Sequence, residues 1–164
     1  MRAMIFGDTA SGKSTFAEDL GELTGTPVIH LDQIMEGIGR DDRISIGKVI
    51  HEEADKDEWI IEGNAFTKDP TYRIERSDIV YAFDFSPVRA MAGHIVRYGH
   101  IKSGLEKRRG SDSEGLNLSY FAPYIFYKYP PRKRAAIAHA QSLEKELIVF
   151  NRKKQAAHYL ASLH

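Results

Sequence analysis

The chain has 164 residues, a length typical of one domain that can bury a real hydrophobic core. Lys plus Arg and Asp plus Glu number 23 each, so bulk charge gives no reason to expect nonspecific binding to nucleic acid or membranes. The absence of cysteine excludes disulfides and thiolate metal sites. No apolar stretch approaches the length of a bilayer span and the start lacks a signal peptide's apolar region, so we expect a cytoplasmic protein.

A short apolar run at residues 2–6 predicts a first, buried strand. Residues 15–23 predict an amphipathic helix, because Phe16, Leu20 and Leu23 fall on one face. Between them lies GDTASGKST, residues 7–15, which matches the spacing G-x-x-x-x-G-K-[ST] of a phosphate-binding loop. A preceding strand and a following helix are the context in which such a loop binds nucleotides, whereas a plain Gly-Ser turn is the alternative reading.

Each residue type in this motif has a physical role. Wrapping backbone amides around phosphates requires main-chain conformations that glycine adopts at little cost. Lys13 supplies a compact charge for the β- and γ-phosphates, and the Ser14 hydroxyl can ligate Mg²⁺. A helix that begins near Gly12 would point its positive end at the phosphates. We therefore expect ATP to contact Gly7, Asp8, Thr9, Ala10, Ser11, Gly12, Lys13, Ser14 and Thr15.

The remaining chain alternates strands with helices. We expect strands at 27–32, 59–63, 78–84 and 147–150, and helices at 45–53, 87–98, 132–145 and 152–163. Ser45 is the expected cap of the first of these helices, and residues 37–43 are an expected loop. The alternation predicts an α/β fold: one P-loop NTPase domain over residues 1–164, with a five-stranded parallel sheet and helices on both faces, as in nucleoside monophosphate kinases.

Acidic side chains close three of the predicted strands. Asp32, Glu62 and Asp84 each end a strand, and ligands bind at the carboxyl ends of strands in parallel sheets. These carboxylates should therefore share one edge with the glycine loop. Asp32 there could position or deprotonate an acceptor hydroxyl, the alternative being a turn or helix cap.

A polar, glycine-containing segment at 99–119 predicts an exposed, lid-like insert. Basic residues in or beside it could close over the transferring phosphoryl group and exclude water. The alternative is a solvated loop whose charges are balanced by its own acidic residues. The candidates are Arg97, Lys107, Arg108, Arg109, Arg132 and Arg134.

Five stretches in the same order resemble one family over nearly the whole chain. Besides the phosphate loop they are VIHLD at 28–32, EWIIEGN at 58–64, RIERSDIVYAFDF at 73–85, RRGSDSEG at 108–115 and YPPRKR at 129–134. They resemble the adenylate-kinase-related P-loop kinases, and within these the group labelled DNA topology modulation proteins. The resemblance implies ATP and Mg²⁺ as ligands, and a role for Glu62 in orienting the water shell of the metal. An exposed strand-end carboxylate is the alternative for Glu62.

The sequence departs from that family's pattern at several positions. Glu36 stands where tryptophan is usual, Glu62 replaces an aspartate, Ala65 replaces a tyrosine, and Gly93 stands where an arginine is expected one helical turn before Arg97. Glu62 keeps its charge. The other departures leave the expectation of ATP binding in place but leave the identity of the acceptor open.

The leading functional hypothesis is a kinase that transfers the γ-phosphoryl group of ATP·Mg²⁺ to a small acceptor, a nucleotide or another metabolite. Lys13, Asp32, Arg97, Arg108 and Arg109 are the expected catalytic residues, Arg134 an expected nucleotide contact, and Ser14 and Glu62 the metal site. The segment at 33–57, with Arg40, Arg43 and Lys48, is the expected acceptor pocket. Either Arg73 or Arg76 could grip an acceptor phosphate, or both could form surface salt bridges.

Two other functions compete with this one. A nucleotide-binding regulator that influences DNA topology without kinase activity would fit the family label, but balanced charge and the lack of a DNA-binding motif argue against tight DNA binding. A partner-stimulated ATPase ranks last, because no residue is assigned to hold the attacking water. The choice between ATP and GTP and the oligomeric state stay open. We expect the aromatic run at 120–129 to be core, and no zinc site among the scattered histidines.

Overall fold

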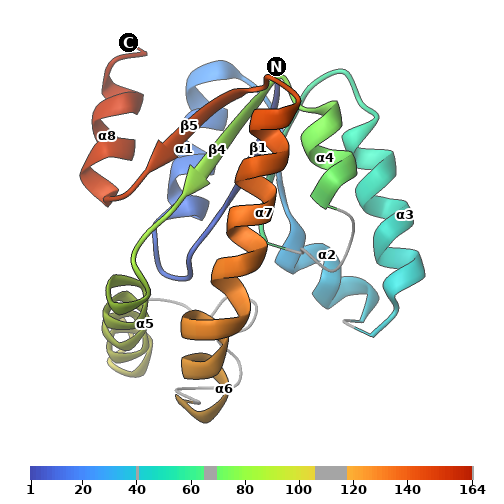
Figure 1. Cartoon of the computed structure of the whole chain (residues 1–164). Coiled ribbons are helices and arrows are strands. Elements are labelled where there is room, and N and C mark those ends of the chain that lie inside the picture. Colours follow the sequence, from blue (N-terminus) through green and yellow to red (C-terminus); the bar gives the residue numbers. More distant parts are fainter. Residues whose placement is uncertain (40, 65–69, 106–117, 164) are drawn as a thin grey trace.

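The computed structural model describes residues 1–39, 41–64, 70–105 and 118–163. Its five strands pair in parallel in the order β2-β3-β1-β4-β5, which confirms the predicted α/β fold (Figure 1). Their bounds are Arg2–Gly7 (β1), Val28–His30 (β2), Trp59–Glu62 (β3), Ile79–Phe83 (β4) and Glu146–Phe150 (β5). Because the carboxyl ends of parallel strands meet at one edge, the segments after β1, β3 and β4 are brought together.

Helices cover both faces of the sheet, as the apolar runs of the strands require. The helices α1 (Lys13–Thr24) and α8 (Lys153–Ala161) pack on one face, where Ala3 and Ile5 of β1 are buried. On the other face Met4 and Phe6 are buried under a second group of helices. That group comprises α3 (Arg43–Ala54), α4 (Pro70–Arg76) and α7 (Tyr129–Ser142), beside the short α2 (Leu31–Ile38). Alternate side chains of one strand thus enter two cores.

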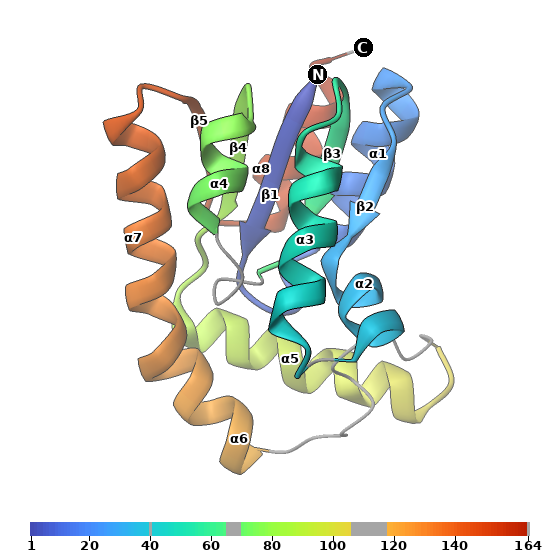
Figure 2. The same ribbon diagram turned by 90° about the vertical axis from the view of Figure 1, so that its right-hand side faces the viewer.

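A further helix, α5 (Pro87–Lys102), lies across the carboxyl ends of the strands rather than on a face of the sheet (Figure 2). It begins at Pro87, and the side chain of Ser86 caps it by accepting a hydrogen bond from the Arg89 amide. Residues Leu118–Pro123 (α6) and a π-helical segment, Tyr124–Lys128 (η2), lead into α7 on the same side. The site edge of the sheet is therefore faced by α5.

Several sequence predictions were wrong in detail. The strand expected at 27–32 ends at His30, and Asp32 lies in the first turn of α2, which also occupies part of the predicted loop. The cap of α3 is Asp42, whose side chain accepts from the Ser45 amide, rather than Ser45 itself. The helix α4 was not predicted at all. The first residues of the expected insert belong to α5, and its residues 106–117 lie outside the described part of the chain.

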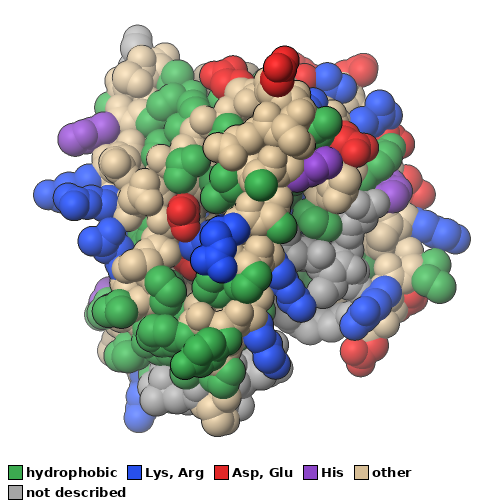
Figure 3. All heavy atoms as spheres, viewed as in Figure 1, with side chains coloured by type: hydrophobic (Ala, Val, Ile, Leu, Met, Phe, Trp, Pro, Cys, Tyr) green, Lys and Arg blue, Asp and Glu red, His purple; other side chains and the backbone are tan. Residues whose placement is uncertain are grey.

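The aromatic run before α7 divides between core and surface. Phe121 and Tyr129 are buried, as predicted, whereas 77 % of Tyr127 is exposed. Figure 3 shows apolar side chains at the surface over α5 and α6. None of the described helices is both long and apolar enough to cross a membrane.

We predict that Phe16→Ala destabilises the fold strongly. The Phe16 ring meets Tyr81, Phe83 and Phe150 edge-on at centroid distances of 5.1, 5.4 and 5.3 Å, and joins α1 to the sheet. Its loss should lower the free energy of unfolding by about 3–5 kcal/mol in urea denaturation. Val88→Ala, at a side chain that is 70 % exposed, is the control and should change it by less than about 0.5 kcal/mol. Equal midpoints for the two variants would contradict this packing.

Candidate nucleotide-binding site

The phosphate loop between β1 and α1 has a backbone that requires glycine at both ends. Gly7 has a φ of 148°, and a β-carbon there would lie 2.4 Å from the Phe83 Cβ. Gly12, with a φ of 92°, is the N-cap of α1. Since Gly12 has no side chain to accept hydrogen bonds from the first-turn amides, the positive end of α1 is presented to the loop.

Lys13 folds back over the same loop. Its Nζ donates to the Asp8 carbonyl oxygen over 2.7 Å, and only 9 % of the residue is exposed. Burial lowers the pKa of the Lys13 ammonium, while the nearby carboxylates of Glu62, Asp32 and Asp8 oppose that shift. The side chain is thus held against the loop by one backbone acceptor and is surrounded by carboxylates.

The residues expected to hold a metal come together beside Lys13. Ser14 Oγ donates to Glu62 Oε2 over 3.2 Å, and His30 Nδ1 donates to the same oxygen over 3.1 Å. Burial alone would raise the pKa of Glu62, but the His30 hydrogen bond and the charge of Lys13 outweigh it, so the pKa lies below its usual value. Glu62 is therefore an anion at neutral pH.

This oxygen pair fits Mg²⁺, which prefers hard oxygen ligands and keeps several waters and phosphate oxygens in its shell. Within the described ranges no group of three or more His, Asp or Glu residues could hold a metal by itself. A hydroxyl and a carboxylate next to a phosphate loop match the sparse protein ligation that Mg²⁺ accepts.

Asp8 turns away from the loop into a buried ion pair. Lys133 of α7, 3 % exposed, donates its three N–H groups to Asp8 Oδ2 (2.5 Å), Asp84 Oδ1 (2.7 Å) and the Phe85 carbonyl oxygen (3.1 Å). Asp8 Oδ2 also accepts from the Phe85 amide over 2.8 Å. Burial raises the pKa of Asp8, and Lys133 offsets that only in part. The Asp8 side chain thus holds the loop in position and does not contribute to the side of the loop that would bind an anion.

Sequence reasoning missed Lys133 and chose its neighbour. Arg134 is exposed on α7 and does not line the cleft beside the loop, so its contact with nucleotide stays a prediction. A signal existed, because Tyr129, Lys133, Ala136 and Ala140 recur at helical spacing and form the buried stripe of α7. The phase of that stripe places residue 133, not 134, toward the core.

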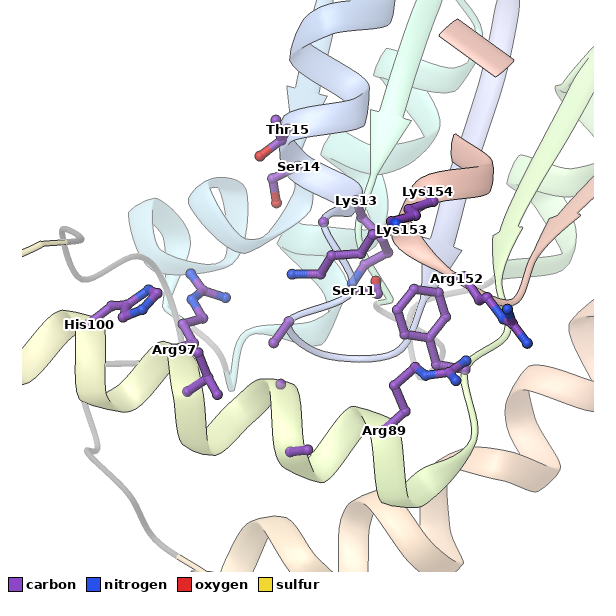
Figure 4. A pocket seen from close by; sticks show the side chains of 16 residues that line it. Ser11, Lys13, Ser14, Thr15, Arg89, Arg97, His100, Arg152, Lys153 and Lys154 are labelled. Atoms are coloured by element: carbon purple, nitrogen blue, oxygen red, sulfur yellow. The ribbon is translucent and has the colours of Figure 1, made fainter. Parts of the chain in front are cut away.

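A cleft of about 930 Å³ opens between the loop, α5 and the start of α8. The described residues that line it include Ala10 to Thr15 and Phe85, and none is acidic. Figure 4 shows Lys13 and Arg97 pointing toward one another, with Arg89 and Arg152 at the other end. The basic side chains of the lining are Lys13, Arg89, Arg97, His100, Arg152, Lys153 and Lys154.

The structure brings together some predicted residues and not others. Lys13 and Arg97 share the cleft, whereas Thr9 does not line it. Asp32 is exposed on α2, near enough to Lys13 for its charge to oppose the lowering of the lysine pKa by burial. Arg108 and Arg109 lie outside the described residues.

The sequence prediction missed the other basic residues of the cleft, which are Arg89 and the run at 152–154, although a signal was available for the run. The run Arg152-Lys153-Lys154 begins two residues after the carboxyl end of a strand, the place where parallel sheets bind ligands. Arg89 carried no comparable signal. Its guanidinium donates to the Asn151 carbonyl oxygen over 2.7 Å and so joins α5 to the β5–α8 connection.

The two arginines before β4 differ in their surroundings. Arg76 forms a surface ion pair with Asp55, so the prediction that both arginines form surface salt bridges is confirmed for Arg76 and is wrong for Arg73. Arg73 is fully buried and donates to the Gly63 carbonyl oxygen over 3.3 Å. Arg73 therefore supports the turn that follows β3, on the site edge of the sheet.

No protein-family model matches the chain, and neither does any curated protein. Solved structures do match. A shikimate kinase from Bacteroides thetaiotaomicron aligns at a TM-score of 0.63 with 15 % identity, over 99 % of this chain and 96 % of that one. A deoxyadenosine kinase from M. mycoides with bound dATP aligns at 0.55 with 13 % identity, over 99 % of each chain. A gluconokinase from Sinorhizobium meliloti 1021 aligns at 0.53 with 16 % identity, over 98 % and 91 %. The chain therefore shares the fold of these solved structures.

We predict that Lys133→Met destabilises the protein by about 3–5 kcal/mol at pH 8, because it leaves Asp8 charged and buried without its partner. Loss of the ammonium should raise the already elevated pKa of Asp8 in the folded state further. The folded variant then binds a proton that the unfolded chain does not, so the stability deficit should shrink as pH falls from about 8 to about 5. Urea denaturation across that range measures it.

Lys128→Met, the same change at an exposed residue of η2, is the matched control. It should stay within about 0.5 kcal/mol of the wild type at every pH. A Lys133→Met deficit that is small, or that grows as pH falls, would contradict the buried ion pair.

Proposed function

We propose that the chain is a phosphotransferase that transfers the γ-phosphoryl group of ATP·Mg²⁺ to a small acceptor. One observation supports this most directly: the glycine loop with its buried Lys13 forms a wall of a cleft whose described lining carries cations and no acidic residue. Such a cleft suits a polyanion such as a nucleoside triphosphate, with its phosphates on the loop. The P-loop kinase fold of the chain is consistent with the same activity.

The loop would bind the phosphates through its amides and Lys13. The lysine ammonium, now bonded to the Asp8 carbonyl oxygen, has further donors for β- and γ-phosphate oxygens. At the other end of the cleft, the planar guanidinium groups of Arg89 and Arg152 suit the face of an aromatic base. Phosphate and base would thus be held by groups on three elements.

Ser14 and Glu62 would hold the metal, the glutamate by way of water. The ion, when bound, supplies charge neutralisation at the β- and γ-phosphates. His30 donates to Glu62 Oε2, the oxygen that faces Ser14, and so keeps that carboxylate oriented toward the loop.

Arg97 and Asp32 would act on the transferring group and the acceptor. Arg97 reaches into the cleft opposite Lys13, where a guanidinium can stabilise charge on the phosphoryl oxygens. Asp32 is exposed, and its charge acts on Lys13. It would accept the proton of an acceptor hydroxyl. Arg108, Arg109 and Arg134 stay predicted members of a basic lid.

The acceptor would occupy the side of the site formed by residues 33–57. Arg43 and Lys48 of this segment are exposed, which suits a compact anion. The named structural neighbours are kinases of three different small molecules, so the fold alone does not select the acceptor. The resemblance to DNA topology modulation proteins, the alternative of a regulator without kinase activity, and a cytoplasmic location stay predictions.

The test is ADP release from ATP·Mg²⁺ with a panel of small hydroxyl- and phosphate-bearing metabolites. One metabolite class should stimulate release, and Lys13→Ala should lower the stimulated rate at least about 100-fold, because it removes a cation from the transferring phosphates. Lys128→Ala is the matched control, since Lys128 is exposed on η2 and does not line the cleft, and it should leave the rate unchanged.

Lys13→Ala should keep the circular dichroism spectrum and melting temperature of a folded protein. An unaltered rate in that variant removes Lys13 from the mechanism. Salt-sensitive DNA binding without stimulation by any metabolite would favour the regulator.

A further inference from the structure

The helix α5 faces the cleft with one stripe of side chains. Its cleft-lining residues recur every three or four positions, as one helical face does, and they are Arg89, Ala92, Gly93, Val96, Arg97 and His100. Gly93 stands in the middle, four residues after Arg89 and four before Arg97. Its contacts therefore affect how both arginines are placed.

Gly93 is the point at which the α5 backbone meets the phosphate loop. A β-carbon at this residue would lie 3.3 Å from the Ala10 Cβ and 3.4 Å from the Ala10 carbonyl oxygen. Carbon atoms in favourable contact are about 3.5–4.0 Å apart, so a side chain at residue 93 would have to displace the helix or the loop. The close approach exists because residue 93 has none.

Ala10 is the loop residue that faces Gly93, and its backbone conformation is unusual for a residue that has a β-carbon. Ala10 has a φ of 54°, a left-handed conformation that a residue with a β-carbon adopts only at a cost. Such a conformation persists where the surroundings hold it. The Ala10 methyl group lies only 3.3 Å from where a β-carbon of residue 93 would be, so one partner carries a β-carbon and the other does not.

We propose that Ala10 and Gly93 form a size-matched contact that sets the distance between α5 and the phosphate loop, and through it the reach of Arg97 toward the phosphates and of Arg89 toward the base of a bound nucleotide. Gly93 is on this account a positioning residue. The inference rests on the proposed nucleotide site. It also gives a physical reason for glycine at this position: a long side chain there would meet the loop before it met a phosphate.

A four-variant experiment tests the contact. Gly93→Ala should lower kcat/KM for ATP about tenfold, because the positions of catalytic groups matter to within fractions of an ångström. Gly99→Ala is the matched control: it makes the same change six residues further along α5, where a β-carbon has nothing within 4 Å, and should leave kcat/KM unchanged. Ala10→Gly and the double variant Ala10→Gly/Gly93→Ala complete the cycle.

The double variant should recover kcat/KM to within about threefold of Ala10→Gly, because deletion of the facing methyl makes room for the new one. The affinity for ATP·Mg²⁺, measured by calorimetry, should follow the same order. Melting temperatures report whether each variant is folded.

Three results would overturn the proposal. The first is wild-type kinetics and affinity in Gly93→Ala, and the second is purely additive effects of the two substitutions in the double variant. The third is that Gly93→Ala is unfolded and the double variant is unfolded to the same extent. If the wild type itself bound no ATP·Mg²⁺, the proposed function would fail, and that outcome is separate from the other three.

Discussion

A single buried ammonium fixes the geometry of the site. Lys133 Nζ is bonded to the loop residue Asp8, to Asp84 and to the Phe85 carbonyl oxygen, so it ties the start of the phosphate loop to the end of β4. The helix α5 begins two residues after Phe85 and carries Arg89 and Arg97 into the cleft. One turn earlier on α7, Tyr129 donates to Asn64 Oδ1, which also accepts from the Gly7 amide. The loop, α5 and α7 are therefore positioned as a unit.

The distribution of charged side chains around the cleft favours an anionic ligand, although the overall charge of the chain does not. The whole chain is neutral by formal charge, yet the described lining of the cleft has basic side chains from the loop, α5 and the start of α8 and no acidic one. The nearby carboxylates have other partners: Asp8 is paired with Lys133, and Glu62 is bonded to His30 and Ser14. The described lining of the cleft is thus basic although the chain as a whole is neutral, as a triphosphate requires, while Asp8 and Glu62 beside it are held by other groups.

The sequence predicts what depends on periodicity and spacing, and fails where tertiary packing decides. The five strands and the loop were predictable because their apolar runs and glycine spacing are local signals. Asp32 was placed on a strand because the apolar run continues through Leu31, although the helix starts there. Arg134 and Lys133 are adjacent basic residues, and the sequence prediction chose Arg134. What separates the two positions is that Lys133 lies on the buried face of α7. The Ala10–Gly93 contact joins residues far apart in the chain, and nothing local indicates it.

The most direct test of the account is a calorimetric titration of the intact protein with ATP, with and without Mg²⁺. We expect one site per chain with a dissociation constant between about 1 µM and 1 mM, the range typical of enzyme substrates. Chelation of the metal should weaken binding at least about tenfold, because Ser14 and Glu62 then lose the ion that links them to the phosphates. Absence of binding at millimolar ATP·Mg²⁺ would contradict the central claim that the loop at residues 7–15 grips a nucleoside triphosphate.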